Sequence, residues 1–248
     1  MNDSFEKTFT REHKELPQIE NLKVFSNSKK LFELLSRLGM VQKGRFEYKG
    51  VTPEGKHLQG EYFFNIRKIP YSETFTALPK YYEQALLEFF PHQEIRKRLL
   101  FASVANGTNL FAPTLVAGMR ARQKHHVADF PADLKEVSFE CIGTEKRKGQ
   151  IMLPEEYLST CPGRWLVFIE DVCNNGTSAG ELIDLAEQLR KEHGLAGYSI
   201  LYLIHRGHKS VLKPKDNVFA LSKVYAPSYP PDKIPLELQS VPLKPYSK

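Results

Sequence analysis

Short, continuous apolar runs alternate with amphipathic helical stretches along this 248-residue chain, and this alternation restricts its possible folds more than any other feature. The runs and the helical stretches follow one another at residues 99–105, 110–121, 137–142, 165–169, 177–192 and 198–204. A strand that is apolar on both faces needs cover on both sides, as in a parallel sheet with helices packed on each face. The sequence therefore predicts an α/β fold with an open, mainly parallel sheet flanked by helices.

The sequence on either side of this region has less regular patterns. Leucine and phenylalanine recur at helical spacing in residues 27–39, where Ser28 is placed to begin a helix and Gly39 to end it. We further expect two helices, at residues 79–90 and 92–100, separated by Pro91. An aromatic strand is expected at residues 61–66, a polar exposed loop at residues 143–150, and a Pro-rich loop or wrapping arm at residues 228–248.

The composition excludes several classes of protein. Apolar residues make up 41% and charged residues 26% of the chain, as in a globular protein with a buried core. No apolar run approaches the roughly 20 residues that span a bilayer, and the polar N-terminus is unlike a secretory signal. Cys141, Cys161 and Cys173 are widely spaced and odd in number, which argues against a disulfide framework or a structural zinc site. We therefore expect a reduced, cytoplasmic protein.

The charge of the chain is mildly basic. A net charge of +6 and a pI of about 9.0 suit nucleic acid or phosphate-rich small molecules as partners. A nucleic-acid-binding protein usually concentrates its basic residues. Here the densest cluster is Lys146-Arg147-Lys148, with Glu145 beside it. We expect neither nucleic acid nor a membrane as a partner. Nucleic-acid binding stays open only as the weakest functional hypothesis, because the basic pI alone suggests it.

Residues 166–183 carry the clearest chemical signature. An apolar strand runs into two acids, Glu170 and Asp171, and a short loop then leads into a helix. Ligands bind at the carboxyl ends of parallel strands, and a helix N-terminus offers unpaired N–H groups to an anion. Gly176 lets the backbone approach closely, and side-chain donors come from Asn174, Asn175, Thr177 and Ser178. We therefore predict that the loop holds a phosphate and that the acids face ribose hydroxyls, with Mg²⁺ nearby.

The structural alternative for this segment is an ordinary turn followed by a helix cap. The adjacent acids, the loop length and the Gly-Thr-Ser start of the helix together favour the ligand-binding interpretation. Residues 166–178 resemble the phosphoribosyl pyrophosphate motif of type I phosphoribosyltransferases, which combines an apolar run, two acids and a short loop with Gly and Thr or Ser. Asn174 and Asn175 stand where the family usually has small residues, and Glu170 is a less common first acid.

Other segments resemble orotate phosphoribosyltransferase and follow that family's order over roughly residues 28–210. The resemblance implies that Lys49 reaches substrate or pyrophosphate, that Phe63 and Phe64 stack on a flat base, and that Arg206 lies near that base. It also implies a pyrophosphate loop and a mobile catalytic loop, which place further site residues at Ala105, Asn106, Gly107, Thr108, Lys146, Arg147 and Lys148.

The same resemblance implies a domain plan and an activity. The plan is an N-terminal arm and small hood at residues 1–95, a phosphoribosyltransferase core at 96–225 and a Pro-rich tail at 226–248. The activity is transfer of 5-phosphoribosyl from phosphoribosyl pyrophosphate to orotate, giving orotidine 5′-phosphate and pyrophosphate in pyrimidine biosynthesis. Mg²⁺ is expected to arrive with the substrate and to have no direct protein ligand. A homodimer is implied, because the mobile loop in this family reaches the partner's site.

Departures from the orotate pattern leave other functions open. The mobile-loop region has Ile142-Gly143 and Lys148 where orotate enzymes commonly have an Arg-Lys pair and a His, and His205 replaces an Asp before the arginine. The chain could therefore act on another base, or bind phosphoribosyl pyrophosphate or a nucleotide without catalysis. The two phenylalanines could also be core residues, and the basic and glycine-containing segments could be ordinary turns.

Overall fold

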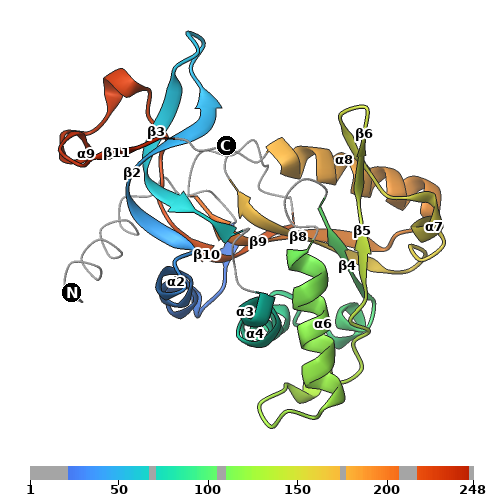
Figure 1. Ribbon diagram of the computed structural model, residues 1–248. Coiled ribbons are helices and arrows are strands. Elements are labelled where there is room, and N and C mark those ends of the chain that lie inside the picture. The colour runs from blue at the N-terminus through green and yellow to red at the C-terminus, as the bar shows by residue number, and fades with distance from the viewer. Residues whose placement is uncertain (1–21, 67–70, 105–109, 174–176, 207–216, 246–248) are drawn as a thin grey trace.

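The computed structural model describes residues 22–66, 71–104, 110–173, 177–206 and 217–245 (Figure 1). Its helices are α2 (Ser28–Arg37), α3 (Tyr71–Thr76), α4 (Leu78–Phe89), α5 (Gln93–Arg96), α6 (Phe111–Lys124), α7 (Glu155–Leu158), α8 (Thr177–His193) and α9 (Leu236–Gln239). Its strands are β1 (Lys23–Val24), β2 (Val41–Val51), β3 (His57–Phe64), β4 (Leu99–Ser103), β5 (Cys141–Gly143), β6 (Glu145–Arg147), β7 (Gln150–Met152), β8 (Trp165–Cys173), β9 (Gly197–His205), β10 (Val218–Lys223) and β11 (Leu243–Lys244).

The central sheet has six strands in the order β1-β10-β9-β8-β4-β5, and each neighbouring pair is parallel. In its middle, β8 pairs with β9 on one side and β4 on the other, with Glu170 opposite Tyr202 and Ile169 opposite Ser103. Because these strands run in one direction, their carboxyl ends meet at one edge, where ligands bind in open α/β sheets. The predicted α/β class with a mainly parallel sheet is confirmed.

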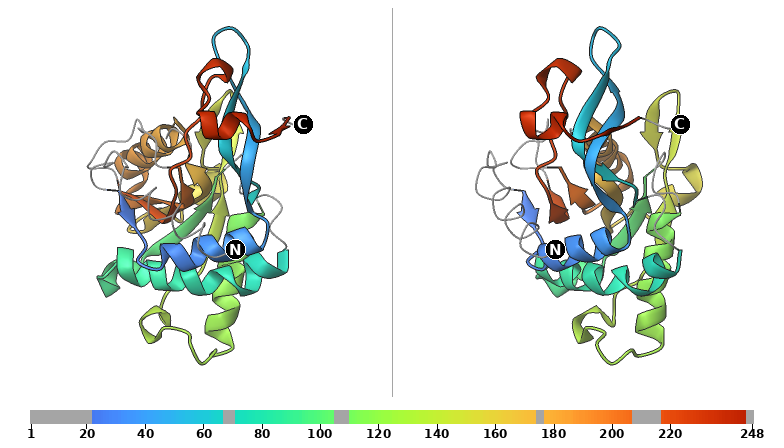
Figure 2. Two further views of the ribbon diagram at one scale, coloured as in Figure 1. Left: turned by 90° about the vertical axis from the view of Figure 1, so that its left-hand side faces the viewer. Right: turned by 60° about the vertical axis from the view of Figure 1, so that its left-hand side comes forward.

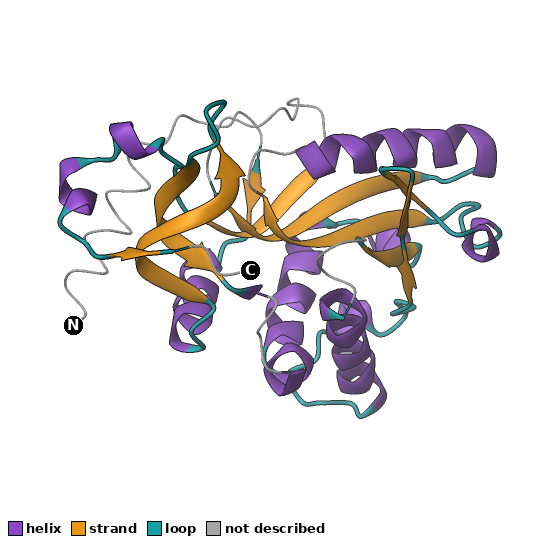
Figure 3. Ribbon diagram, turned by 45° about the horizontal axis from the view of Figure 1, so that its top comes forward, coloured by secondary structure: helices purple, strands orange, loops and turns teal. Residues whose placement is uncertain are grey.

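Helices cover both faces of this sheet, as the alternation of buried side chains along β8 requires. Val167 and Ile169 belong to one apolar cluster, which includes side chains from α2, α4 and α6. Leu166 and Phe168 belong to a second cluster, in which the apolar side of α8 packs on the opposite face. Figure 3 shows the sheet between these two helical layers. The two-sided burial explains why β8 is apolar at consecutive positions.

A separate three-stranded sheet, which we call the hood, has the order β11-β2-β3. β2 and β3 form an antiparallel hairpin with two irregularities in register, and β11 lies parallel to β2. Gln59 and Tyr229 exchange backbone hydrogen bonds, and Arg45 donates to the carbonyl oxygen of Gln239 over 3.2 Å. In both views of Figure 2, the C-terminal segment lies against the β2–β3 hairpin. The C-terminal segment is therefore a structural part of the hood, as well as the predicted wrapping arm.

The polar segment at residues 143–150 is not the irregular exposed loop that we predicted. It forms the antiparallel hairpin of β6 and β7, with Arg147 opposite Gln150. Lys148 and Gly149 form its turn with positive φ angles of 48° and 87°, which suit a two-residue hairpin connection. A charged sequence without hydrophobic alternation gave no sign of this pairing.

Other element boundaries also differ from the prediction. The expected helix at residues 92–100 ends at Arg96, and Leu99 begins β4, because the apolar side chains that follow are buried within the sheet. Of residues 137–142, only the last two belong to a strand, although Val137 and Phe139 are buried. The predicted helices at residues 27–39, 79–90, 110–121 and 177–192 are confirmed as α2, α4, α6 and α8.

Candidate functional site

The candidate site lies where β8 ends and α8 begins. β8 reaches Cys173, which pairs with His205 at the end of β9, and α8 starts at Thr177. Asn174, Asn175 and Gly176, which connect the two elements, lie outside the described residues. The N-terminus of this 17-residue helix is thus held at the carboxyl edge of the sheet, and its unpaired N–H groups favour an anion there.

Glu170 is the buried acid of the pair, with 9% of its surface exposed. It lies opposite Tyr202 of β9, on the side of the sheet that α8 covers. The pKa of the Glu170 carboxyl is raised to about 7, chiefly by burial; a hydrogen bond from Tyr202 lowers it, and the charges of Asp171 and Glu181 raise it. Glu170 therefore changes its charge near neutral pH, whereas an ordinary glutamate is fully ionised there.

Asp171 is half-buried and lies toward the other side of the sheet. The backbone N–H of Val172 donates to its Oδ1 over 2.7 Å. Its negative charge raises the pKa of the Tyr82 hydroxyl on α4, which burial already raises more strongly. The two carboxyl groups thus meet the edge of the sheet from opposite faces, and a ribose that lies across the end of β8 can contact one from each side.

The predicted phosphate-binding residues are only partly described. Ser178 is exposed in the first turn of α8, next to the buried Ala179. Four of the remaining positions lie outside the described residues: Ala105, Asn106, Gly107 and Thr108. The other two, Lys49 in β2 and Thr177 in α8, belong to described elements, but their side chains are not described. β4 ends at Ser103, beside β8, so the segment that follows it starts at the same edge as the candidate site.

The three predicted loop cations belong to the β6–β7 hairpin, and two of them form ion pairs. Lys146 Nζ lies 3.6 Å from Glu181 Oε2 on α8, and Arg147 Nε lies 2.7 Å from Glu145 Oε1. Lys148, in the turn, is exposed. Figure 1 shows the hairpin beside α8, and Ile151 of β7 belongs to the same apolar cluster as the buried side of that helix. The structure therefore brings one of these cations, Lys146, into contact with an acid in the second turn of α8.

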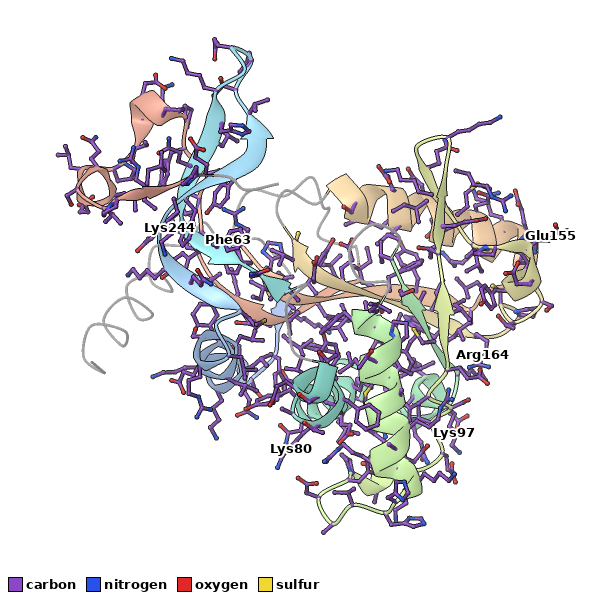
Figure 4. All side chains as sticks on the ribbon, in the orientation of Figure 1. Phe63, Lys80, Lys97, Glu155, Arg164 and Lys244 are labelled. Carbon is purple, nitrogen blue, oxygen red and sulfur yellow. The ribbon has the colours of Figure 1, made fainter. Side chains whose placement is uncertain are left out.

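Phe63 and Phe64 point to opposite faces of β3, because successive side chains of a strand alternate. The Phe63 ring stacks on Phe46 at a centroid distance of 5.4 Å, and Phe64 stacks on Tyr62 at 6.2 Å. Figure 4 shows Phe63 and Lys244 in the hood, where Lys244 Nζ lies 5.0 Å from the centre of the Phe46 ring. The two phenylalanines cannot both stack on one face of the same base.

Arg206 connects the edge of the central sheet to the hood. It is 6% exposed, and its Nη2 donates to the carbonyl oxygen of Ala226 over 2.5 Å and to Ser228 Oγ over 3.3 Å. Its guanidinium lies 4.7 Å from the centre of the Tyr48 ring and 5.7 Å from that of Phe64. Sequence reasoning missed Tyr48 as a partner, because only folding brings β2 over the end of β9.

Tyr202 is a second site-adjacent residue that the sequence did not reveal. Its hydroxyl forms hydrogen bonds with Glu170 and Cys173, within the cluster under α8. A tyrosine between Leu201 and Leu203, within the apolar run of β9, was the available signal, since a buried hydroxyl needs a polar partner. The identity of that partner depends on the register between β8 and β9.

Two other kinds of site are absent from the described residues. None of the described helices is long and apolar enough to cross a membrane. In the same part of the chain, no group of three or more His, Cys, Asp or Glu residues is arranged to hold a metal ion.

Comparison with known proteins gives a similarity of fold at low sequence identity. No family model matches the sequence, and no curated protein matches it. UMP synthase from Leishmania donovani is 17% identical with a TM-score of 0.46, over 79% of this chain and 36% of that one. Orotate phosphoribosyltransferase from Francisella tularensis is 18% identical with a TM-score of 0.44, over 78% of this chain and 85% of that one.

A third solved structure is that of a phosphoribosyltransferase named for hypoxanthine and not for orotate. Hypoxanthine phosphoribosyltransferase from Trypanosoma cruzi is 13% identical with a TM-score of 0.43, over 61% of this chain and 78% of that one. Similarity at this level does not distinguish among acceptor bases and does not by itself support a function. The function has to be argued from the chemistry of the site.

Proposed function

We propose that this protein is a phosphoribosyltransferase, which transfers 5-phosphoribosyl from phosphoribosyl pyrophosphate to a planar base and releases pyrophosphate. One observation carries the proposal: a buried parallel strand carries Glu170 and Asp171 near its carboxyl end, and the N-terminus of α8 follows at the same edge of the sheet. Two acids suit the ribose hydroxyls, and a helix N-terminus suits the 5′-phosphate. Phosphoribosyl pyrophosphate carries both groups on one molecule.

In the proposed complex, the ribose lies across the end of β8. Glu170 and Asp171 accept hydrogen bonds from its hydroxyls, and their charge favours the oxocarbenium character that develops at C1. Asn174, Asn175, Gly176, Thr177 and Ser178 surround the 5′-phosphate. Ala105, Asn106, Gly107 and Thr108 after β4, together with Lys49, hold the pyrophosphate. When bound with the substrate, Mg²⁺ neutralises part of the pyrophosphate charge.

The β6–β7 hairpin is the proposed source of cations for the leaving pyrophosphate. Lys146 contacts α8, Arg147 and Lys148 lie on the same hairpin, and closure of the hairpin would exclude water from the reacting centre. Lys146 must then exchange its contact with Glu181 for one with the substrate. We also propose a homodimer in which this hairpin approaches the partner's site.

Orotate is the acceptor that we propose first, on the basis of the sequence resemblance. Only one of Phe63 and Phe64 can cover a given face of the base, because they lie on opposite faces of β3. Phe64 is the better candidate, since it lies beside Arg206, at the end of β9. The hydrogen bonds from Arg206 to the C-terminal segment support a role in fixing the hood over the base.

The test is a screen of orotate, uracil and the purine bases for pyrophosphate release, with phosphoribosyl pyrophosphate and Mg²⁺ present. We expect turnover with one base and a loss of at least about tenfold in kcat/KM for Asp171→Asn. Asp184→Asn is the matched control, because Asp184 is exposed on α8 and lies more than one turn beyond the proposed phosphate site. Absence of turnover with every base would exclude the enzymatic proposal.

A second candidate function is binding of phosphoribosyl pyrophosphate or a nucleotide without catalysis. The ion pairs of Lys146 and Arg147 favour it, because cations held by protein acids are less available to a leaving pyrophosphate. Isothermal titration calorimetry separates the two functions. Micromolar binding of phosphoribosyl pyrophosphate without pyrophosphate release from any base would support the non-catalytic function and exclude transfer.

A further inference from the structure

Tyr202 lies on β9, directly opposite Glu170 of β8 and beneath the candidate ribose site. We propose that Tyr202 is a positioning residue whose hydroxyl holds the Glu170 carboxyl in place for ribose binding. This inference rests on the proposed function, because it assigns a ribose to Glu170. It adds a residue that none of the sequence patterns had identified.

The register of the central sheet sets the contact. Glu170 of β8 and Tyr202 of β9 are direct partners in a parallel pair, and their side chains point to the α8 face. Tyr202 is 1% exposed and belongs to the same apolar cluster as Ala179 and Leu182 of α8. The helix thus closes over both side chains, and the phenol has no freedom to turn toward solvent.

The Tyr202 hydroxyl forms hydrogen bonds with two groups, Glu170 and Cys173. A hydroxyl carries one proton and accepts through its oxygen. The carboxylate is the stronger acceptor, so the Tyr202 hydroxyl donates to Glu170 and the Cys173 thiol donates to the Tyr202 oxygen. This chain of hydrogen bonds fixes the position of the carboxyl and uses only one of its acceptor sites.

The charged and titratable groups around Glu170 mostly oppose its ionisation. Asp171 on its own strand and Glu181 on α8 both raise the pKa of Glu170, as burial does more strongly. Lys146 of β6 is paired with Glu181, and His205 of β9 lies behind Tyr202 at a ring-centroid distance of 6.4 Å. The Tyr202 hydrogen bond acts in the opposite direction from burial and from both acids. Because the resulting pKa is about 7, the loss of one hydrogen bond changes the fraction of ionised Glu170 at neutral pH.

Ionisation of Glu170 should control ligand affinity. A carboxylate accepts hydrogen bonds from ribose hydroxyls through both oxygens, whereas the protonated acid loses part of this capacity. Binding of phosphoribosyl pyrophosphate should therefore strengthen as the pH rises through about 7, the pKa of Glu170. In Tyr202→Phe the same rise should occur at higher pH, with affinity at pH 7 lower by about fivefold.

The experiment combines two measurements on the full chain. Carbon-detected NMR of protein labelled at glutamate side-chain carboxyl carbons follows the titration of Glu170, with Glu170→Gln to assign its signal. Calorimetry gives the affinity for phosphoribosyl pyrophosphate with Mg²⁺ between pH 6 and 8.5. Tyr198→Phe is the matched control, since Tyr198 lies four residues earlier on β9, on the same face and near the other end of the strand. We expect Tyr202→Phe alone to move both titrations to higher pH.

The outcomes separate this inference from the function on which it rests. If the ligand binds and the Glu170 titration is the same in wild type and Tyr202→Phe, the inference is wrong and the proposed function stands. If phosphoribosyl pyrophosphate does not bind the wild type at any pH, the proposed function is wrong and the inference fails with it. In a Glu170→Gln background, Tyr202→Phe should leave the pH dependence unchanged, and a further shift would assign that dependence to another group.

Discussion

Burial of the ionised Glu170 carboxyl lowers the stability of the folded protein, and the same residue has a role in the proposed reaction. The fold buries its carboxyl under α8, near two other acids, and raises its pKa to about 7. A buried acid that titrates near neutral pH is unusual on a strand and is common at functional sites. At the scale of single residues, the strongest indication of function is therefore an acid that the fold holds in an unfavourable position.

This position predicts how stability depends on pH. The pKa of Glu170 is higher in the folded than in the unfolded chain, so the folded state binds the extra proton between about pH 4.5 and 7. The proton bound by Glu170 therefore stabilises the folded state at acidic pH, and this stabilisation is lost as the pH rises to about 7. Glu170→Gln should be more stable than wild type at pH 8, by up to about 3 kcal/mol, and equal to it near pH 4.5.

Urea denaturation of both proteins at these two pH values measures the difference. Glu192→Gln serves as the control, because Glu192 lies exposed near the end of α8 and should give no such pH dependence. A constant difference between wild type and Glu170→Gln across the pH range would show that Glu170 titrates normally.

At the scale of elements, helix α6, which packs under the central sheet, is itself in close contact with α3. α3 packs on α6 at Gly118, where an added Cβ would meet the carbonyl group of Phe75 and would lie 2.7 Å from Pro79 Cγ. Backbone atoms cannot move away as a flexible side chain can. The glycine in α6 is therefore a packing requirement, even though glycine lowers helix propensity.

Gly118→Ala should lower the free energy of unfolding by roughly 2 kcal/mol, since overpacking against backbone forces the two helices apart. Gly180→Ala is the matched control: Gly180 is also helical, but an added Cβ there meets nothing within 4 Å. That variant should be neutral or more stable by up to about 1 kcal/mol. Equal effects in the two denaturation curves would rule out the close approach as the cause.

At the scale of the whole molecule, the C-terminal segment completes the hood and joins it to the central sheet. β11 covers one side of β2, and Ala226 and Ser228 hold Arg206 at the end of β9. Phe46 of β2 is only 5% exposed and lies under Lys244. The hood therefore depends on residues from opposite ends of the chain.

Truncation after Pro235 should loosen the hood while the central sheet remains folded. Hydrogen exchange should accelerate in β2 and β3 by at least about tenfold, because removal of β11 and α9 exposes Phe46 and frees one edge of β2. Exchange in β8 and β9 should change little. Removal of residues 246–248 alone is the control, since it leaves β11 in place. Uniform acceleration throughout the chain would contradict an independent role for the hood.

The sequence by itself determined the α/β class, the main helices and the strand–loop–helix at residues 166–183, because hydrophobic periodicity and helix boundaries are local properties. It did not determine the β6–β7 hairpin or the pairing of β11 with β2, which depend on turn geometry and on contacts between distant segments. Nor could it place Tyr202 opposite Glu170, Lys146 beside Glu181, or Arg206 against Tyr48. Only the tertiary structure decided these contacts, because strand register and helix packing set them, and neither leaves a pattern in neighbouring residues.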